Sequence, residues 1–125
     1  ATVALPYAAT AAPLEYRPGL ADEHLGKGEI VFLDFKASWC STCAAQERVI
    51  NALKAENPAY EAKITFINVD WDTYSNSHLA RRLKIPRPST LVVLKGDEEL
   101  GRIVAQTSRA SIKELMDTAL TAASA

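Results

Sequence analysis

The chain has 125 residues, of which 48% are hydrophobic and 23% charged, and this is the composition of one globular domain with its own core. Its 14 Lys and Arg residues against 15 Asp and Glu residues give a formal net charge of -1, so we expect no nucleic-acid partner. No apolar run reaches the roughly 18 residues of a membrane-spanning helix, and two cysteines are too few for a disulfide scaffold or a four-thiolate zinc site.

The first segment, residues 1–13, consists mainly of small and apolar residues and carries neither a charge nor a helical or strand period. It contains Ala9-Thr10-Ala11, an A-x-A pattern of the kind that signal peptidases cut. We therefore expect residues 1–13 to be the remnant of an export signal and the protein to be periplasmic. The alternative is a flexible N-terminal extension of a cytoplasmic protein. Residues 14–125 are expected to form the folded domain.

From residue 14 onward, strand and helix patterns alternate without an internal repeat. Compact apolar runs are typical of buried strands. The longest helical pattern places Ala45, Val49 and Leu53 on one stripe, and Asn57-Pro58 stops it because the residue before a proline disfavours the helical conformation. The elements expected in the first half are a short helix over 20–25, a buried strand over 30–36 and a helix over 40–57.

The second half continues this alternation and then adds a hairpin. Ser75 and Ser108 are expected to cap two helices, and Gly96-Asp97 has the composition of a hairpin turn. The order of the elements predicts an α/β fold in which helices cover a mixed sheet. The elements expected here are strands over 63–69, 90–94 and 100–105, a helix from residue 75 to about residue 84, and a last helix with Ile112, Leu115, Met116, Ala119 and Leu120 on its apolar face.

The two thiols, Cys40 and Cys43, stand where the strand over 30–36 gives way to a helix. Cysteines three residues apart on a first helical turn lie within the roughly 4.4–6.8 Å between Cα atoms that a disulfide requires. The helix start stabilises a thiolate at Cys40, because unpaired N–H groups and the macrodipole favour an anion there. Cys43, one turn further on, is placed to resolve a mixed disulfide at Cys40, which predicts thiol–disulfide exchange.

Two other interpretations of the thiol pair are weaker on physical grounds. A metal site would need two more ligands, and neither His24 nor His78 has a ligand-like spacing, so we expect both to be surface residues and no metal to be bound. A purely structural disulfide between Cys40 and Cys43 would close a loop of only four residues, which constrains the unfolded chain very little. Redox chemistry therefore remains the favoured interpretation.

Asp34 is an acidic residue inside an apolar strand, flanked by Leu33 and Phe35. Burial of a carboxylate is costly, so the pKa of Asp34 is expected to be raised. Such an acid, six residues before Cys40, could accept the proton of Cys43 when that thiol becomes a nucleophile. The alternative is an outward-facing Asp34 on an edge strand.

The run from Asp34 to Cys43 (DFKASWCSTC) resembles the D-F-x-A-x-W-C-x-x-C motif of the thioredoxin family, and the resemblance extends over about residues 25–122. It is most similar to exported bacterial thioredoxin domains, including the C-terminal domain of the disulfide-bond reductase D family. The resemblance implies a thioredoxin-like fold, with helices flanking a central mixed β-sheet. It further implies a monomeric thiol–disulfide oxidoreductase without a cofactor, which reduces protein disulfides and is recharged by a redox donor protein. Disulfide oxidase or isomerase activity and a metal-handling module remain the alternatives.

By the same resemblance, substrate is expected to contact Trp39, Ser41, Thr42, Pro88 and Ser89. Ser89 stands in the place of the family's cis-proline, and Pro88 comes one residue early. Two interpretations stay open: Pro88 is cis beside a one-residue bulge, or Ser89 fills the position after an ordinary trans bond. Phe66 stands where the family has a lysine beside the buried acid, which predicts that Asp34 lacks that cation.

Overall fold

The computed structural model describes residues 12–125. The expected export-signal remnant therefore lies almost wholly outside the described residues and stays a prediction. Two of the described elements are long helices, α2 and α6, and the other four helices have seven residues or fewer. In chain order the elements are β1 (Leu14–Glu15), α1 (Leu20–Gly26), β2 (Ile30–Lys36), α2 (Ser41–Glu56), α3 (Ala59–Lys63), β3 (Ile64–Asp70), α4 (Trp71–Tyr74), α5 (His78–Arg82), β4 (Thr90–Lys95), β5 (Glu98–Val104) and α6 (Arg109–Ala123).

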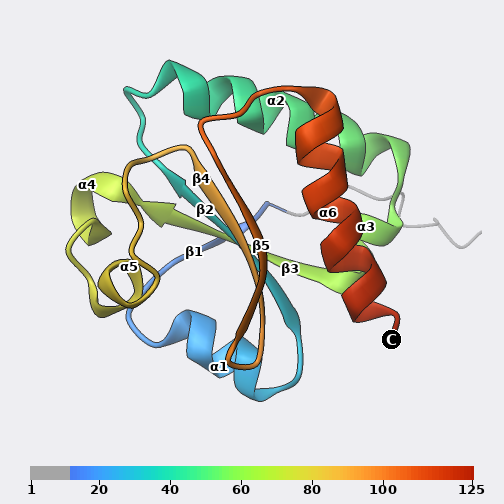
Figure 1. Cartoon of the computed structure of the whole chain (residues 1–125), viewed down its shortest axis with the longest axis horizontal. Coiled ribbons are helices and arrows are strands. Elements are labelled where there is room, and N and C mark those ends of the chain that lie inside the picture. Colours follow the sequence, from blue (N-terminus) through green and yellow to red (C-terminus); the bar gives the residue numbers. More distant parts are fainter. Residues whose placement is uncertain (1–11) are drawn as a thin grey trace, which may run out of the picture.

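The strands form one mixed five-stranded sheet in the order β1-β3-β2-β4-β5 (Figure 1). The central strand β2 runs parallel to β3 and antiparallel to β4, so the sequence-based prediction of a mixed sheet is confirmed. Side chains alternate between the two faces of a strand. Ile30 and Phe32 accordingly pack in one core with residues of α2, α3 and α6, while Val31, Leu33 and Phe35 pack in a second core with residues of α1 and α5.

The helix expected from Ser75 to about residue 84 is present only over His78–Arg82, as α5, and its predicted start is wrong. Ser75 ends α4, and its N–H donates to the carbonyl of Trp71. The next helix, α5, is capped by Ser77, whose Oγ accepts from the N–H of Ala80 at 3.2 Å. Sequence pattern could not distinguish the two serines, since both have the side chain that N-caps require.

The buried face of α2 also differs from the expected stripe. Ala45 and Val49 are only half-buried, whereas Gln46 is fully buried. An apolar stripe does not include Gln46, but the side-chain amide of this residue points inward and donates to two backbone carbonyls. The elements β1, α3 and α4 were not expected, because segments of two to five residues are too short to show a period. The buried side chains of α2 are those of Cys43, Gln46, Ile50, Leu53 and Lys54.

Candidate active site

Cys40 and Cys43 lie at the start of α2 and form a disulfide, with their Cα atoms 5.2 Å apart. Cys40 is the N-cap residue, and its Sγ accepts a hydrogen bond from the backbone N–H of Cys43 at 3.1 Å. Cys40 is 6% exposed and Cys43 1%. Cys40 is therefore the more accessible of the two cysteines, and the first turn of a 16-residue helix favours negative charge on its sulfur.

Ser89, the residue that directly precedes β4, lies beside the Cys40 sulfur. All peptide bonds of the described residues are trans, and Ser89 has a left-handed backbone conformation with φ 64°. Its Oγ lies 3.6 Å from the Sγ of Cys40, while Pro88 is buried beside it. Of the two interpretations of this segment, the structure has the one in which Ser89 fills the position after a trans bond.

Two tryptophans flank the pair in different ways. Trp39 is 65% exposed, and its Nε1 donates to both carboxylate oxygens of Asp72, at 3.0 and 3.2 Å. Trp71 is half-buried and packs against Cys40 and Cys43. Trp39 is thus an exposed aromatic surface beside the disulfide, held in orientation by Asp72. Of the two residues between the cysteines, Ser41 is exposed and Thr42 half-exposed.

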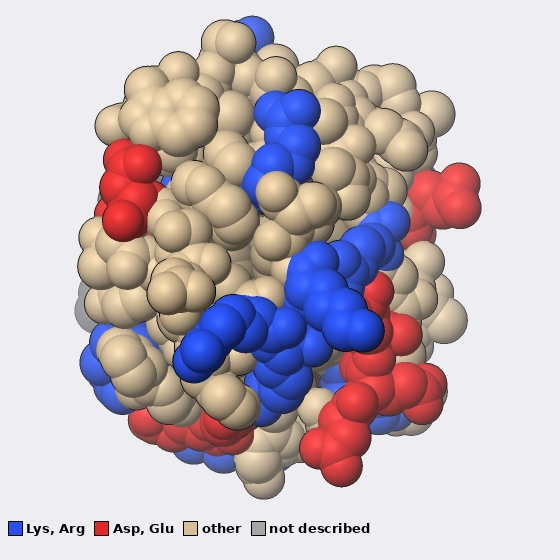
Figure 2. Space-filling view, turned by 60° about the vertical axis from the view of Figure 1, so that its left-hand side comes forward, with Lys and Arg blue, Asp and Glu red and all other residues tan. Residues whose placement is uncertain are grey.

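Basic side chains occur along the segment that leads from α5 to Ser89, and of these Arg87 is the one that contacts Ser89. Arg81, Arg82, Lys84 and Arg87 are all exposed, and Arg82 pairs with Asp22 at 3.3 Å. Figure 2 shows that Lys and Arg side chains gather on this side of the molecule.

Asp34 lies on the central strand β2, on the face that α2 covers, and is 6% exposed. The expectation of a buried acid is confirmed, and the alternative of an outward-facing residue on an edge strand is wrong. Its Oδ1 is buried without a hydrogen-bond partner. Burial raises the pKa of Asp34 to about 7, because it disfavours the charged form more than the nearby Lys36 ammonium favours it.

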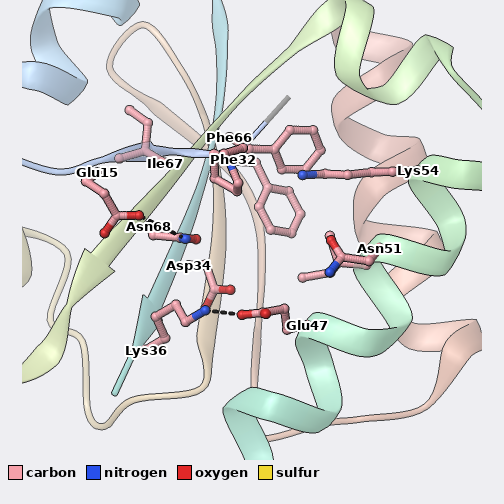
Figure 3. A pocket seen from close by; sticks show the side chains of 13 residues that line it. Glu15, Phe32, Asp34, Lys36, Glu47, Asn51, Lys54, Phe66, Ile67 and Asn68 are labelled. Atoms are coloured by element: carbon pink, nitrogen blue, oxygen red, sulfur yellow. Dashed lines mark hydrogen bonds and ion pairs between the residues drawn. The ribbon is translucent and has the colours of Figure 1, made fainter. Parts of the chain in front are cut away.

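A cavity of about 260 Å³ opens beside Asp34 between α2 and the sheet (Figure 3). At one side of it, Lys36 forms an ion pair with Glu47 of α2. At the other, the Nζ of Lys54 lies 4.0 Å from the centre of the Phe66 ring. Burial lowers the pKa of the Lys54 ammonium, and the Asp34 charge opposes that effect.

Asp34 lacks the strand lysine of the family, as predicted, but a different cation takes part in its cavity. Phe66 does occupy the strand position, but Lys54 reaches the same cavity from α2 and lowers the pKa of Asp34, as Lys36 also does. Lys54 follows the buried Ile50 by four residues, which places it on the inner face of the helix. That spacing was the signal that could have identified it.

Substitutions of the ion pair should shift the pKa of Asp34 in opposite directions. Lys36→Met removes the cation that lowers this pKa and should raise it, whereas Glu47→Gln removes an anion that raises it and should lower it. Carbon NMR titration of the Asp34 carboxyl measures both. The matched control is Lys95→Met, which also removes one cation, from an exposed position at the far end of β4. It should leave the titration of Asp34 unchanged. Shifts of the same sign in the two variants would contradict this picture.

The histidines do not join the thiols in a metal site. Among residues 12–125, no group of three or more His, Cys, Asp and Glu side chains is placed to hold a metal ion. His78 is exposed as expected, but His24 is half-buried and its Nδ1 lies 2.8 Å from Glu29. Within the same part of the chain, no helix has the length and apolar character to cross a membrane.

A family model described as Thioredoxin matches residues 16–118. The chain belongs to the thioredoxin family. Among curated members, Thioredoxin H2-1 of Oryza sativa subsp. japonica is 33% identical over 85 residues, which are 68% of this chain but only 57% of the rice protein. Thioredoxin of Mycolicibacterium smegmatis is 29% identical over 94 residues, or 74% of this chain and 81% of that protein.

Solved structures agree with this assignment. The crystal structure of Trxlp from Edwardsiella tarda EIB202 superposes with a TM-score of 0.70 at 27% sequence identity, covering 82% of this chain and 97% of that one. This thioredoxin-family protein is therefore a thiol–disulfide oxidoreductase, with a Cys40–Cys43 disulfide in its C-x-x-C motif.

Proposed function

We propose that this protein acts as a reductant of disulfides in partner proteins and that Cys40 is the attacking thiol. The observation that carries the proposal is the asymmetry of the pair. Cys40 caps α2 with its sulfur at the donor end of the helix, and Cys43 lies one turn inside it. The Ser41-Thr42 pair between them contains no histidine that could further stabilise the thiolate, and this favours a reducing direction over a strongly oxidising one.

In the proposed cycle the Cys40 thiolate attacks one sulfur of the partner's disulfide, forming a mixed disulfide and releasing the partner's other sulfur as a thiolate. Cys43 then loses its proton and attacks the Cys40 sulfur. This step forms the Cys40–Cys43 disulfide and releases the partner's second sulfur as a thiolate. The partner's disulfide gains the two electrons that the two cysteines lose, and a redox donor protein returns them. Asp34, with a pKa of about 7, is suited to accept the Cys43 proton at neutral pH.

The proposed partner-binding surface surrounds the disulfide. Trp39 offers an exposed aromatic ring, Ser41 and Thr42 form the turn between the sulfurs, and Pro88 and Ser89 form the opposite wall. Trp39 is the strongest candidate for partner contact, because an exposed aromatic side chain gains most when a partner covers it.

The test is the redox equilibrium of the Cys40–Cys43 pair with glutathione, combined with reduction of insulin by the dithiol form. A reductant should have a potential well below that of the glutathione pool and should precipitate insulin at a rate proportional to its concentration. A pair that stays reduced in a glutathione mixture and oxidises reduced proteins instead would identify an oxidase or isomerase. Either outcome leaves the thiol–disulfide chemistry in place and decides its direction.

We also propose that the protein is exported to the periplasm, as exported bacterial thioredoxin domains such as the C-terminal domain of the disulfide-bond reductase D family are. The support is the Ala9-Thr10-Ala11 pattern that precedes the folded domain. N-terminal sequencing of the protein from its native host should find a chain that starts near Ala12. A mature chain that begins well upstream of Ala1 would contradict export by this signal.

A further inference from the structure

We propose that the Ser89 hydroxyl donates a hydrogen bond to the Cys40 thiolate and that Arg87 is the positioning residue that turns this hydroxyl toward the sulfur. The inference rests on the proposed function in one respect, since it assumes that Cys40 is the attacking thiol. It adds to that function a residue that sets how much of Cys40 is ionised and how strongly the pair reduces.

The position of Ser89 is set by its backbone. Its N–H donates to the carbonyl of Phe35 at 2.7 Å, and its carbonyl accepts from Gln46 Nε2 at 3.0 Å and from the N–H of Ala105 at 2.9 Å. The residue is fully buried, and its φ of 64° is one that non-glycine residues adopt mainly where the surroundings impose it. Ser89 is therefore held in a single place, with its side chain at the sulfur.

Arg87 determines which atom is the donor in the hydrogen bond between the Ser89 hydroxyl and the Cys40 sulfur. Its Nη2 donates to the Oγ of Ser89 at 3.1 Å, and its Nε donates to the carbonyl of Pro88 at 3.0 Å. A guanidinium has no acceptor, so the Ser89 oxygen must accept in this contact and its own proton is free for another partner. The Sγ of Cys40, 3.6 Å away, is the partner that the structure supplies.

The Cys40 sulfur thus has two donors, the Ser89 hydroxyl and the Cys43 N–H, in addition to the start of α2. Hydrogen bonds to an ionised group are stronger than those to a neutral one, so both donors favour the thiolate over the thiol. In the mixed disulfide and in the Cys40–Cys43 disulfide the sulfur carries no charge and these bonds are weaker. The Ser89 hydroxyl therefore stabilises the reduced form selectively, and it raises the reduction potential of the pair.

The charged groups to be considered around Cys40 lie on three different segments of the chain. Arg87 precedes β4, Asp72 belongs to α4 and is bound to Trp39, and Asp34 lies on β2. The first turn of α2 carries no acidic residue. Arg87 is the cation that contacts the proposed donor, so its effect can be separated from those of the two carboxylates.

The test is alkylation of the fully reduced chain by iodoacetamide as a function of pH, with Cys40 identified by mass spectrometry. At pH values below the midpoint of the titration, Ser89→Ala should decrease the fraction of Cys40 that is thiolate by about tenfold. This is the usual effect of losing one hydrogen bond to a charged group. The equilibrium of this variant with glutathione should shift about tenfold toward the protein disulfide. Ser89→Gly lacks the hydroxyl but adopts the left-handed backbone without strain, so it tests the same point should the alanine variant fold poorly.

Arg87→Met should shift the titration in the same direction by a smaller factor, and Arg87→Lys should restore part of the loss. Arg81→Met removes an exposed cation of α5 that has no contact with Ser89 and is the matched control, with no shift expected. Wild-type titrations for both Ser89→Ala and Ser89→Gly would overturn the inference. A shifted titration in a protein that fails to reduce insulin would instead refute the proposed direction and leave the role of Ser89 intact.

Discussion

Replacing Cys43 with serine is expected to leave the protein attached to its partners through a stable mixed disulfide at Cys40, because the resolving thiol is gone while the attacking thiol remains at the start of α2. Replacing Cys40 with serine should abolish both attachment and turnover. Non-reducing electrophoresis and mass spectrometry of the trapped species measure attachment, and insulin reduction measures turnover, which should fall to the uncatalysed rate in both variants.

The matched control is Ala44→Ser, which introduces a serine on the exposed side of the same helical turn without touching either sulfur. It should neither trap partners nor lose activity. Trapping by the Cys40→Ser variant through Cys43 would reverse the assignment of attacking and resolving thiols. It would also remove the reason for placing a functional hydroxyl at Ser89, since that hydroxyl contacts the Cys40 sulfur.

Replacing Asp34 with asparagine should slow the release of the mixed disulfide at neutral pH and leave the first attack by Cys40 nearly unchanged. The amide keeps the shape of the carboxyl group but cannot accept the Cys43 proton. The two titrations are expected to be coupled in the reduced protein, because a Cys43 thiolate would raise the pKa of Asp34 further. Rapid mixing with a model disulfide separates the two steps, and an unchanged second step would make Asp34 a bystander.

The same variant should be at least as stable as the wild type, and more stable at high pH. The pKa of Asp34 is raised from 3.8 to about 7, so between these values the folded state binds more protons than the unfolded state. Asp34 therefore lowers the free energy of unfolding progressively as pH rises through this interval, by up to about 4 kcal/mol above it. Below the unfolded-state value the contribution vanishes.

Urea unfolding of the oxidised protein at several pH values measures this effect. The wild type should lose stability between pH 4 and pH 7 relative to Asp34→Asn, and the difference should level off at higher pH. Asp97→Asn, in the exposed turn between β4 and β5, is the matched control and should follow the wild-type curve. Parallel curves for wild type and Asp34→Asn would show that the carboxyl is ionised in the folded protein at no cost, contrary to its burial without a partner for Oδ1.

The amino-acid sequence by itself determined the features that depend on neighbours along the chain. The apolar run of β2, the cap at Ser108 with its apolar helix face, and the placement of Cys40 and Cys43 at a strand-to-helix junction all follow from local pattern. The burial of Asp34 was expected from its apolar neighbours Leu33 and Phe35, but the central place of β2 in the sheet was needed to exclude the edge-strand alternative. Each of these features depends on residues that are close together in the sequence. The mixed sheet and the thioredoxin family that they predicted are the ones observed.

Only the tertiary structure decided which distant side chains meet the reacting groups. Ser89 reaches the Cys40 sulfur from 49 positions away, and Arg87 turns its hydroxyl. Lys54 enters the Asp34 cavity from a helix, although the strand position opposite is taken by Phe66. Which atom donates in a hydrogen bond, and which charge is buried, depends on how distant segments pack against each other. The periodicity of the sequence does not predict those contacts.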